Sequence, residues 1–283
     1  MPRMPHPTPA ELRRDPHPLR GRTALVTGAS RRGGIGFAVA RRLAAYGASV
    51  YLHHHVAHDQ EMPWGADRPD EVAAAVRDAR GDDEAVVVHG PADLTAPDAP
   101  AQLIRDAADA LGGRLDIVVA NHALSGSDGT LDTIDAAMLD AHWAVDARSV
   151  VLLVQAFARH RAAVPDEPGG RVVMMTSGQD IAGGMPGEIA YALQKGALAS
   201  ITRSLATTLA PRCVTVNTVN PGPVDTDYMD GEAYDAIAGL FPAKRWGMPD
   251  DPARLVAWLA TDEAAWITGQ VIDSEGGFRR TLG

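Results

Sequence analysis

Short apolar runs alternate along the chain with longer stretches whose apolar residues recur at helical spacing. The short runs are rich in β-branched residues and predict strands at 22–27, 49–52, 85–89, 117–120, 171–176, 214–219 and 271–273. The longer stretches predict helices at 37–46, 70–79, 99–111, 136–161, 191–210 and 252–260. This alternation indicates a parallel sheet, because a helix has to carry the chain back between parallel strands. Right-handed crossovers then give a doubly wound α/β sheet with helices on both faces.

A glycine-rich turn, Gly28–Gly36, joins the first predicted strand to the first predicted helix. In this context the backbone can approach a pyrophosphate closely, and the helix N-terminus offers free N–H groups to it. A tight turn that merely needs glycine is the alternative interpretation.

Tyr191 and Lys195 lie four residues apart in a predicted helix, so both side chains project from the same face. A phenol has a reference pKa of about 10, and a nearby ammonium lowers it by about 1–3 units. The pair can therefore exchange a proton near neutral pH, although this spacing also arises by chance.

Polar residues and glycines follow the ends of several predicted strands. Ligands of doubly wound sheets bind at the carboxyl ends of the strands, so one cleft should collect these residues. They are Gly28–Gly36, Asp93, Asn121, Ser177 and Pro221–Gly222.

In order and spacing these motifs resemble those of the short-chain dehydrogenase/reductase family, and they are similar to those of its 3-oxoacyl carrier-protein reductases. The resemblance covers about residues 20–280. It implies a single-domain Rossmann fold over residues 21–283, after a flexible extension at 1–20, and hydride transfer between a nicotinamide cofactor and an alcohol or ketone. The motifs are TGASRRGGIG at 27–36, ADLT at 92–95, DIVVANHA at 116–123, Ser177, YALQK at 191–195, NTVNPGPVDT at 217–226, the run at 245–272 and SEGG at 274–277.

The resemblance also implies roles for individual residues. Ser177 donates a hydrogen bond to the substrate oxygen, Tyr191 protonates it, and Lys195 lowers the Tyr191 pKa and holds the nicotinamide ribose. Asp146 takes the fourth catalytic position. The expected cofactor-binding residues are Gly28, Ser30, Arg31, Arg32, Gly34, Ile35, Gly36, His53, Asp93, Leu94, Asn121, Tyr191, Lys195, Pro221, Gly222, Val224 and Thr226.

Asp146 departs from the family pattern, in which an Asn usually holds a proton-relay water through its backbone carbonyl. Asp keeps that carbonyl, but its charge could pair with Lys195 and weaken the influence of Lys195 on Tyr191. The glycine loop is also longer than the commonest version, and residues 120–123 differ from the usual run. A dinucleotide-binding sensor or scaffold without turnover is therefore one alternative, and dehydratase or epimerase chemistry is another.

Cofactor preference follows from charge. An NAD-preferring site usually places an acid at the end of the second strand, where this chain has His53, His54 and His55. Arg31 and Arg32 in the glycine loop could hold a 2′-phosphate, so NADP(H) is favoured over NAD(H).

The histidine cluster is not expected to bind a metal, because adjacent residues of an extended chain point in opposite directions. A solvated loop near the adenosine end is the interpretation we favour for it. His122 and His142 are expected to pack or to form local hydrogen bonds.

Composition is that of a globular protein: 283 residues, 46% of them hydrophobic, with a formal charge of −10. This charge argues against nucleic acid or an anionic membrane as a partner. The single Cys213 is expected to be a small buried residue in a cytoplasmic protein.

The resemblance further implies a mobile lid over the substrate at 228–244, with an ordinary surface helix as the alternative. The lid has few charges, which suits a moderately hydrophobic ketone. A homodimer or homotetramer is implied, formed through the long helices and the last strands. An apolar face for that contact is expected from Ala147, Val150, Val151, Val154 and Ala158.

Overall fold

Seven parallel strands form one sheet in a computed structural model that describes residues 13–163, 169–178, 184–227 and 229–278. The spatial order is β3-β2-β1-β4-β5-β6-β7, and each neighbouring pair is parallel. This order runs outward in both directions from β1 and β4, as expected for a doubly wound sheet. The strands are β1 (Thr23–Val26), β2 (Ser49–His54), β3 (Val87–Pro91), β4 (Ile117–Ala120), β5 (Arg171–Met175), β6 (Thr215–Asn220) and β7 (Val271–Asp273).

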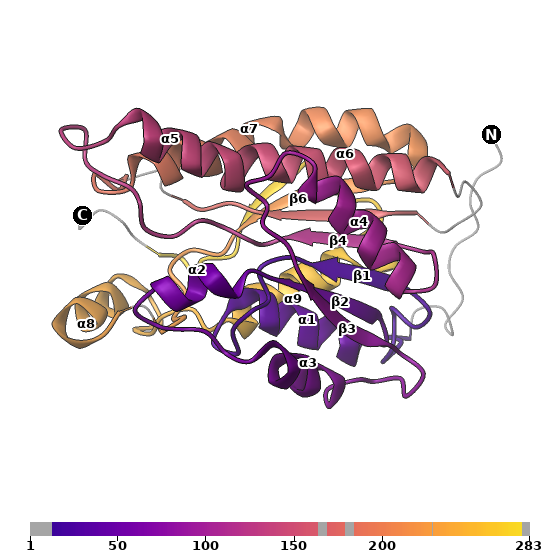
Figure 1. Cartoon of the computed structure of the whole chain (residues 1–283). Helices are drawn as coiled ribbons and strands as arrows, with labels where there is room; N and C mark the ends of the chain where they lie inside the picture. The colour runs from indigo at the N-terminus through magenta and orange to yellow at the C-terminus, as the bar shows by residue number, and fades with distance from the viewer. Residues whose placement is uncertain (1–12, 164–168, 179–183, 228, 279–283) are drawn as a thin grey trace.

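Helices cover both faces of the sheet (Figure 1). Helices α4, α6 and α7 lie on one face, and α1, α3 and α9 lie on the other, so the predicted single-domain Rossmann fold is confirmed. Their bounds are α1 (Ile35–Ala45), α2 (Val56–Glu61), α3 (Pro69–Arg77), α4 (Ala99–Ala110), α5 (Ala136–His142), α6 (Ser149–Ala162), α7 (Ile189–Leu209), α8 (Gly231–Leu240) and α9 (Asp250–Leu259), with short η2 (Ala210–Arg212) and η3 (Asp262–Ala264).

The central strands are buried on both sides, and this explains why the sequence shows continuous apolar runs instead of an alternation. The parallel register brings Val26, Val119 and Val173 side by side across the sheet. The loops that leave β1, β4 and β5 therefore emerge together at the carboxyl edge. No described helix is both long and apolar enough to cross a membrane.

The predicted helix 136–161 is not uniformly α-helical. A π-helical segment, η1 (Trp143–Arg148), separates α5 from α6 and contains Asp146. Such single π turns are rare and occur often at functional sites. Helix α2 was not predicted, and α8 occupies most of the predicted lid and has no fully buried residue.

Four of the five residues assigned to an apolar contact face belong instead to the core. Ala147, Val150, Val154 and Ala158 are all at most 6% exposed, because their i, i+3, i+7 and i+11 spacing places them on the inward face of the helix. Val150, Val154 and Ala158 pack in one core cluster with residues of the central strands. Only Val151 is partly exposed.

Three further expectations need correction. Cys213 is exposed, in a left-handed turn with φ of 56°, because it leaves η2 before β6 begins. His53 and His54 are buried strand residues and do not form a solvated loop. In the expected extension at 1–20, residues 1–12 lie outside the described part, and Leu19 is 1% exposed and packs in the core.

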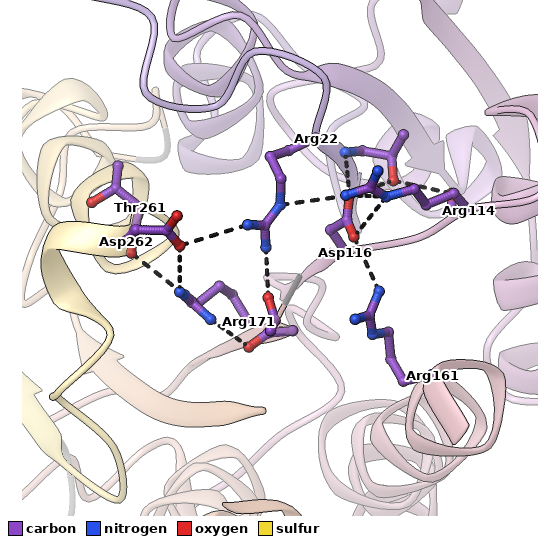
Figure 2. Close-up of polar contacts among 10 residues, drawn as sticks. Arg22, Arg114, Asp116, Arg161, Arg171, Thr261 and Asp262 are labelled. Atoms are coloured by element: carbon purple, nitrogen blue, oxygen red, sulfur yellow. Dashed lines mark hydrogen bonds and ion pairs between the residues drawn. The ribbon is translucent and has the colours of Figure 1, made fainter. Parts of the chain in front are cut away.

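A buried charge cluster ties the amino ends of the strands together, at the edge opposite the carboxyl ends (Figure 2). Asp116 is fully buried and accepts hydrogen bonds from Arg114 Nε at 2.9 Å and Arg161 Nη1 at 3.1 Å. Its other oxygen accepts from the Thr23 amide at 3.0 Å and lies 3.6 Å from Arg22 Nε. The carboxylate thus joins the starts of β1 and β4 to α6.

We predict that Asp116→Asn destabilises the protein by about 3–5 kcal/mol, because removing one charge of a buried ion pair leaves the other uncompensated. Urea unfolding followed by circular dichroism measures this. Asp109→Asn is the matched control, since Asp109 is exposed on α4. Equal unfolding free energies for the two variants would contradict the assignment.

Candidate active site

A cavity of about 400 Å³ lies at the carboxyl edge of the sheet, bounded by the turn after β1, by α2 and by the loops after β3 and β4. Its wall includes many of the residues that the sequence predicted for cofactor binding. These are Gly28, Ser30, Arg31, Gly34, Ile35, His53, Asp93, Leu94, Asn121 and Thr226.

The turn after β1 is packed so closely that side chains would not fit. Gly28 has φ of +66°, and a Cβ there would lie 2.7 Å from the His122 backbone. A Cβ on Gly36 would collide with the carbonyl of Gly28. Asn121 Nδ2 holds the turn by donating to the carbonyls of Thr27 and Gly28 at 3.1 and 3.0 Å.

The N-terminus of α1 is suited to a phosphate. Gly34 is the N-cap; within the described residues no side chain caps this end, and the first turn carries no acid. Its N–H groups and the positive end of the helix dipole face the glycine turn, the geometry that binds a pyrophosphate. The residues present therefore fit a dinucleotide.

His53 holds the turn from the neighbouring strand. Its Nδ1 accepts from the Gly28 amide at 3.2 Å, and its Nε2 donates to the Ala92 carbonyl at 3.0 Å. Burial lowers the pKa of His53 to about 4, so the ring is neutral at pH 7. Its role is to fix the turn against the loop after β3.

The two arginines of the glycine loop diverge. Arg31 lines the cavity, donates to the Thr226 carbonyl at 3.1 Å and lies over the Trp64 ring, 4.9 Å from its centroid. Arg32 instead contacts Asp67, through its amide at 2.7 Å and its guanidinium at 3.2 Å. Arg32, also expected at the 2′-phosphate, is not part of the cavity wall.

Asp59 on α2 is a cavity residue that sequence reasoning missed. Its carboxylate accepts from Ser30 Oγ and lies 3.6 Å from Arg31 Nε. The sequence has no acid at the end of β2, but α2, which follows β2, places Asp59 at the same end of the cavity. No local pattern marks this, because α2 is a short helix that was not predicted.

Asp93 shapes the loop after β3. One of its oxygens accepts from the Thr95 amide at 2.9 Å and from the Thr95 hydroxyl at 2.7 Å. The hydrogen bonds with Thr95 keep the pKa of Asp93 below its ordinary value. Leu94 beside it is buried and completes this part of the cavity wall.

The side chain of Lys195, a residue of α7, reaches the end of β5. Its side chain is 2% exposed, and Nζ donates to the carbonyl of Met175, the last residue of β5, at 3.1 Å. Thr176 Oγ1 donates to the Lys195 carbonyl at 2.7 Å and so fixes α7 to the strand end. Ser177 follows directly, which brings the predicted serine next to the helix that carries Tyr191.

The Lys195 ammonium also contacts Tyr191, since Nζ lies 5.4 Å from the centroid of the tyrosine ring. Burial lowers the pKa of Lys195, and the negative charge of Asp146 partly opposes this effect. The structure therefore places the buried Lys195 amine beside the phenol ring, on the same helix face as the four-residue spacing predicted.

Asp146 is fully buried and does not form the ion pair with Lys195 that the sequence suggested. In the described part of the chain its carboxylate accepts from the Leu124 amide at 2.7 Å and contacts His142 Nδ1 at 2.7 Å.

Asp128 caps α7 by accepting from the amides of Ala190 and Tyr191 at 2.9 and 2.8 Å. Sequence reasoning missed this role of Asp128, and the i, i+4 spacing of His142 and Asp146 was the available sign of their contact.

The turn after β6 reaches across to the glycine loop. Gly222 has φ of +62°, and its amide donates to Asn220 Oδ1 at 3.0 Å, which shapes the turn after Pro221. Val224 is buried and bridges to Gly247. Thr226 then lines the cavity beside Arg31.

The next segment, α8, is anchored to the loop before α9, because the Tyr234 ring stacks on the Trp246 ring with centroids 5.0 Å apart. Tyr228 of the predicted lid lies outside the described residues.

The chain is similar in sequence to several known proteins. A family model described as enoyl-(acyl carrier protein) reductase matches residues 28–279. An uncharacterized oxidoreductase of Bacillus subtilis (strain 168) is 43% identical over 258 residues, covering 91% of this chain and 96% of that protein. Versicolorin reductase 1 of Aspergillus parasiticus is 32% identical over 278 residues, covering 93% of this chain and 98% of that protein.

Among solved structures, a short-chain dehydrogenase from Burkholderia cenocepacia J2315 in complex with NADP is 35% identical. It superposes with a TM-score of 0.79 over 92% of this chain and 98% of that chain. The chain therefore belongs to the short-chain dehydrogenase/reductase family and is an NAD(P)-dependent oxidoreductase acting on alcohol or carbonyl groups.

Proposed function

We propose that the protein interconverts a ketone and a secondary alcohol with NADP(H), and that Tyr191 is its general acid and base. The observation that carries the proposal is the buried Lys195 ammonium, 5.4 Å from the Tyr191 ring centroid and fixed to the end of β5. A bound nicotinamide supplies or accepts the hydride. The protein's residues orient the substrate oxygen and exchange its proton.

Each catalytic side chain has a distinct part in the proposal. Ser177 donates a hydrogen bond to the substrate oxygen, and Tyr191 gives it a proton as negative charge develops there. Lys195 favours the phenolate form of Tyr191 by its charge. Asp146 contributes its backbone carbonyl, because its carboxylate is engaged by Leu124 and His142.

The preference for NADP(H) rests on Arg31. Its guanidinium lies in the cavity wall at the end where α2 approaches, held over Trp64 and against Asp59. A guanidinium can bind a 2′-phosphate through two hydrogen bonds. Asp59 at the same place carries the opposite charge, so the preference depends on the balance of these two residues. The NADP complex of the Burkholderia cenocepacia relative supports the proposal.

For the substrate we propose a moderately hydrophobic ketone. The helix expected to cover it, α8, presents the half-buried apolar residues Tyr234, Ile237 and Leu240. Similarity to versicolorin reductase 1 supports a search among polyketide-like ketones.

We predict that Tyr191→Phe lowers kcat by at least about 100-fold while leaving NADPH binding within about twofold, because it removes the proton donor and keeps the ring. NADPH consumption with a panel of ketones measures turnover, and NADPH fluorescence titration measures binding. Tyr46→Phe, on the far side of α1, is the control for loss of a tyrosine hydroxyl. Unimpaired turnover of Tyr191→Phe would remove the assignment.

We predict that Arg31→Gln weakens NADPH binding by about 10- to 100-fold and NADH binding far less, since a hydrogen bond to a charged group contributes about 1.5–3 kcal/mol. Arg32→Gln is the matched control: the neighbouring arginine faces Asp67 and Glu71 and should leave the ratio of the two dissociation constants unchanged. Fluorescence titration with NADPH and with NADH measures the two dissociation constants of each variant. Equal losses for NADPH and NADH would contradict the role of Arg31.

We also propose that the protein is a homodimer or homotetramer. With Ala147, Val150, Val154 and Ala158 in the core, other residues have to provide the contact. Trp266 is 99% exposed next to the edge strand β7, where Val271 is 45% exposed. Trp143 on η1 and Leu193 on α7 are exposed as well.

We predict that Trp266→Ser shifts the protein toward smaller assemblies, because an exposed indole beside an edge strand favours association. Light scattering after size exclusion gives the mass. Leu131→Ser is the control, since Leu131 is 81% exposed in the loop before α5. A monomeric wild-type protein at micromolar concentration would refute the proposal.

A further inference from the structure

Two titratable side chains, His142 and Asp146, lie fully buried one helical turn apart, and the His142 ring lies beside Tyr191. They are 1% and 0% exposed, and 2.7 Å separates His142 Nδ1 from Asp146 Oδ2. The other carboxylate oxygen accepts from the Leu124 amide at 2.7 Å. The Asp146 carboxylate therefore contacts His142, four residues earlier in the chain, and the backbone of the loop after β4.

Both ring nitrogens of His142 face oxygen acceptors. Nδ1 faces the Asp146 carboxylate, and Nε2 lies 3.0 Å from the Gly126 carbonyl and 3.9 Å from Asp128 Oδ2. A neutral imidazole has a single N–H, so one nitrogen would present its lone pair to another lone pair. An imidazolium donates to both acceptors.

A neutral carboxylic acid on Asp146 would also satisfy these contacts, with its proton donated to Nδ1. Two facts favour the ionic form. A carboxylate is a weaker base than imidazole, with reference pKa values of about 3.9 and about 6.5. The amide of Leu124 also donates to the other oxygen of this carboxyl, so with an imidazolium at His142 each oxygen of a carboxylate has a donor. The proton therefore resides on the ring.

The charges around His142 agree with this assignment. Burial lowers the pKa of His142, but the hydrogen bond and charge of Asp146, the Gly126 carbonyl and the charge of Asp128 outweigh it and raise the pKa above its ordinary value. On the α7 side the ring meets Tyr191. Lys195 Nζ, on the same helix, lies 5.4 Å from the centroid of the Tyr191 ring and donates to the Met175 carbonyl.

The pair is connected to the tyrosine in two ways. The His142 ring meets the Tyr191 ring edge to face, with centroids 6.1 Å apart and planes at 86°. Asp128, on the far side of the imidazole, accepts from the backbone amide of Tyr191 at 2.8 Å. Loss of charge on His142 would loosen the loop 124–128 and the first turn of α7 together.

We propose that His142 and Asp146 are positioning residues, a buried imidazolium–carboxylate pair that fixes the Tyr191 ring and the loop 124–128 for proton transfer. This inference rests on the proposed role of Tyr191. It also explains how an acid is accommodated at the Asp146 position: the neighbouring imidazolium neutralises it, and the Lys195 ammonium is not bound by it.

The protonation state can be measured directly. Nitrogen-15 NMR of the ring of His142 in the intact protein, followed as the pH is raised, should show two protonated nitrogens up to a titration midpoint above the ordinary value of about 6.5, with the signal assigned by its loss in His142→Gln. A midpoint at or below the ordinary value would overturn the proposal without any assay of activity.

Kinetics test the positioning role. His142→Gln should lower kcat by about 10- to 100-fold through displacement of Tyr191, with the Kd of NADPH within about twofold. The wild-type profile of kcat should contain a decline as pH rises through the His142 pKa, and the variant should lack it. His89→Gln, which breaks a partly exposed contact with Asp70, is the matched control and should leave kcat unchanged.

Stability gives a second readout with a defined sign. Because the folded-state pKa of His142 is raised, its contribution is fully present below the unfolded value of about 6.5 and is lost as pH rises through the folded value. The melting temperature of wild type should therefore fall more between these values than that of His142→Gln. Equal pH dependence, together with unchanged kcat, would overturn the proposal.

The two proposals fail in different ways. If Tyr191→Phe retains turnover, the proposed function fails while the NMR result for His142 stands. If Tyr191 is essential and His142→Gln keeps both its rate and its pH profile, only the positioning role fails.

Asp146→Asn is the variant to use if His142→Gln does not fold. The His142 ring should then titrate at lower pH than in the wild type, because its anionic partner is lost. An unchanged titration of His142 would contradict the proposed ion pair.

Discussion

One buried cation fixes the relation between the sheet and the chemistry proposed for it. Lys195 has almost no solvent contact, and the protein holds its ammonium with the last carbonyl of β5 and beside the Tyr191 ring. Removing an ammonium from water is costly unless polar partners replace the water. Since those partners belong to β5 and α7, the strand end and the helix must stay in register for the site to exist. The proposed proton donor is thereby placed at the same edge of the sheet as the cavity proposed for the dinucleotide.

The parts of the site that sequence alone could predict depend on local rules. Gly28 and Gly36 are needed where backbone atoms leave no room for a Cβ, and a strand and a helix on either side make that need visible in the sequence. Tyr191 and Lys195 share a face because a helix repeats every 3.6 residues. Asn121 follows a buried strand, and the parallel register delivers it to the glycine turn.

The parts that could not be predicted depend on contacts between distant segments. Arg31 and Arg32 are neighbours with the same chemistry, and only the folded chain shows that one faces the cavity while Asp67 holds the other. Asp59 returns to the cavity on a helix too short to show a period. The face of α6 was misassigned because an apolar stripe does not reveal whether it meets the sheet or another subunit. The partnership of His142 with Asp146 and Asp128 needs the π turn and the loop after β4 in place.

The central claim is that the dinucleotide cavity and Tyr191 form one site. A crystal structure of the protein with NADP⁺ tests it most directly. We predict the pyrophosphate at the N-terminus of α1, the 2′-phosphate on Arg31, and the nicotinamide ring next to Tyr191 and Lys195. A nicotinamide ring bound away from these two residues, or a Tyr191 hydroxyl turned away from it, would contradict the account.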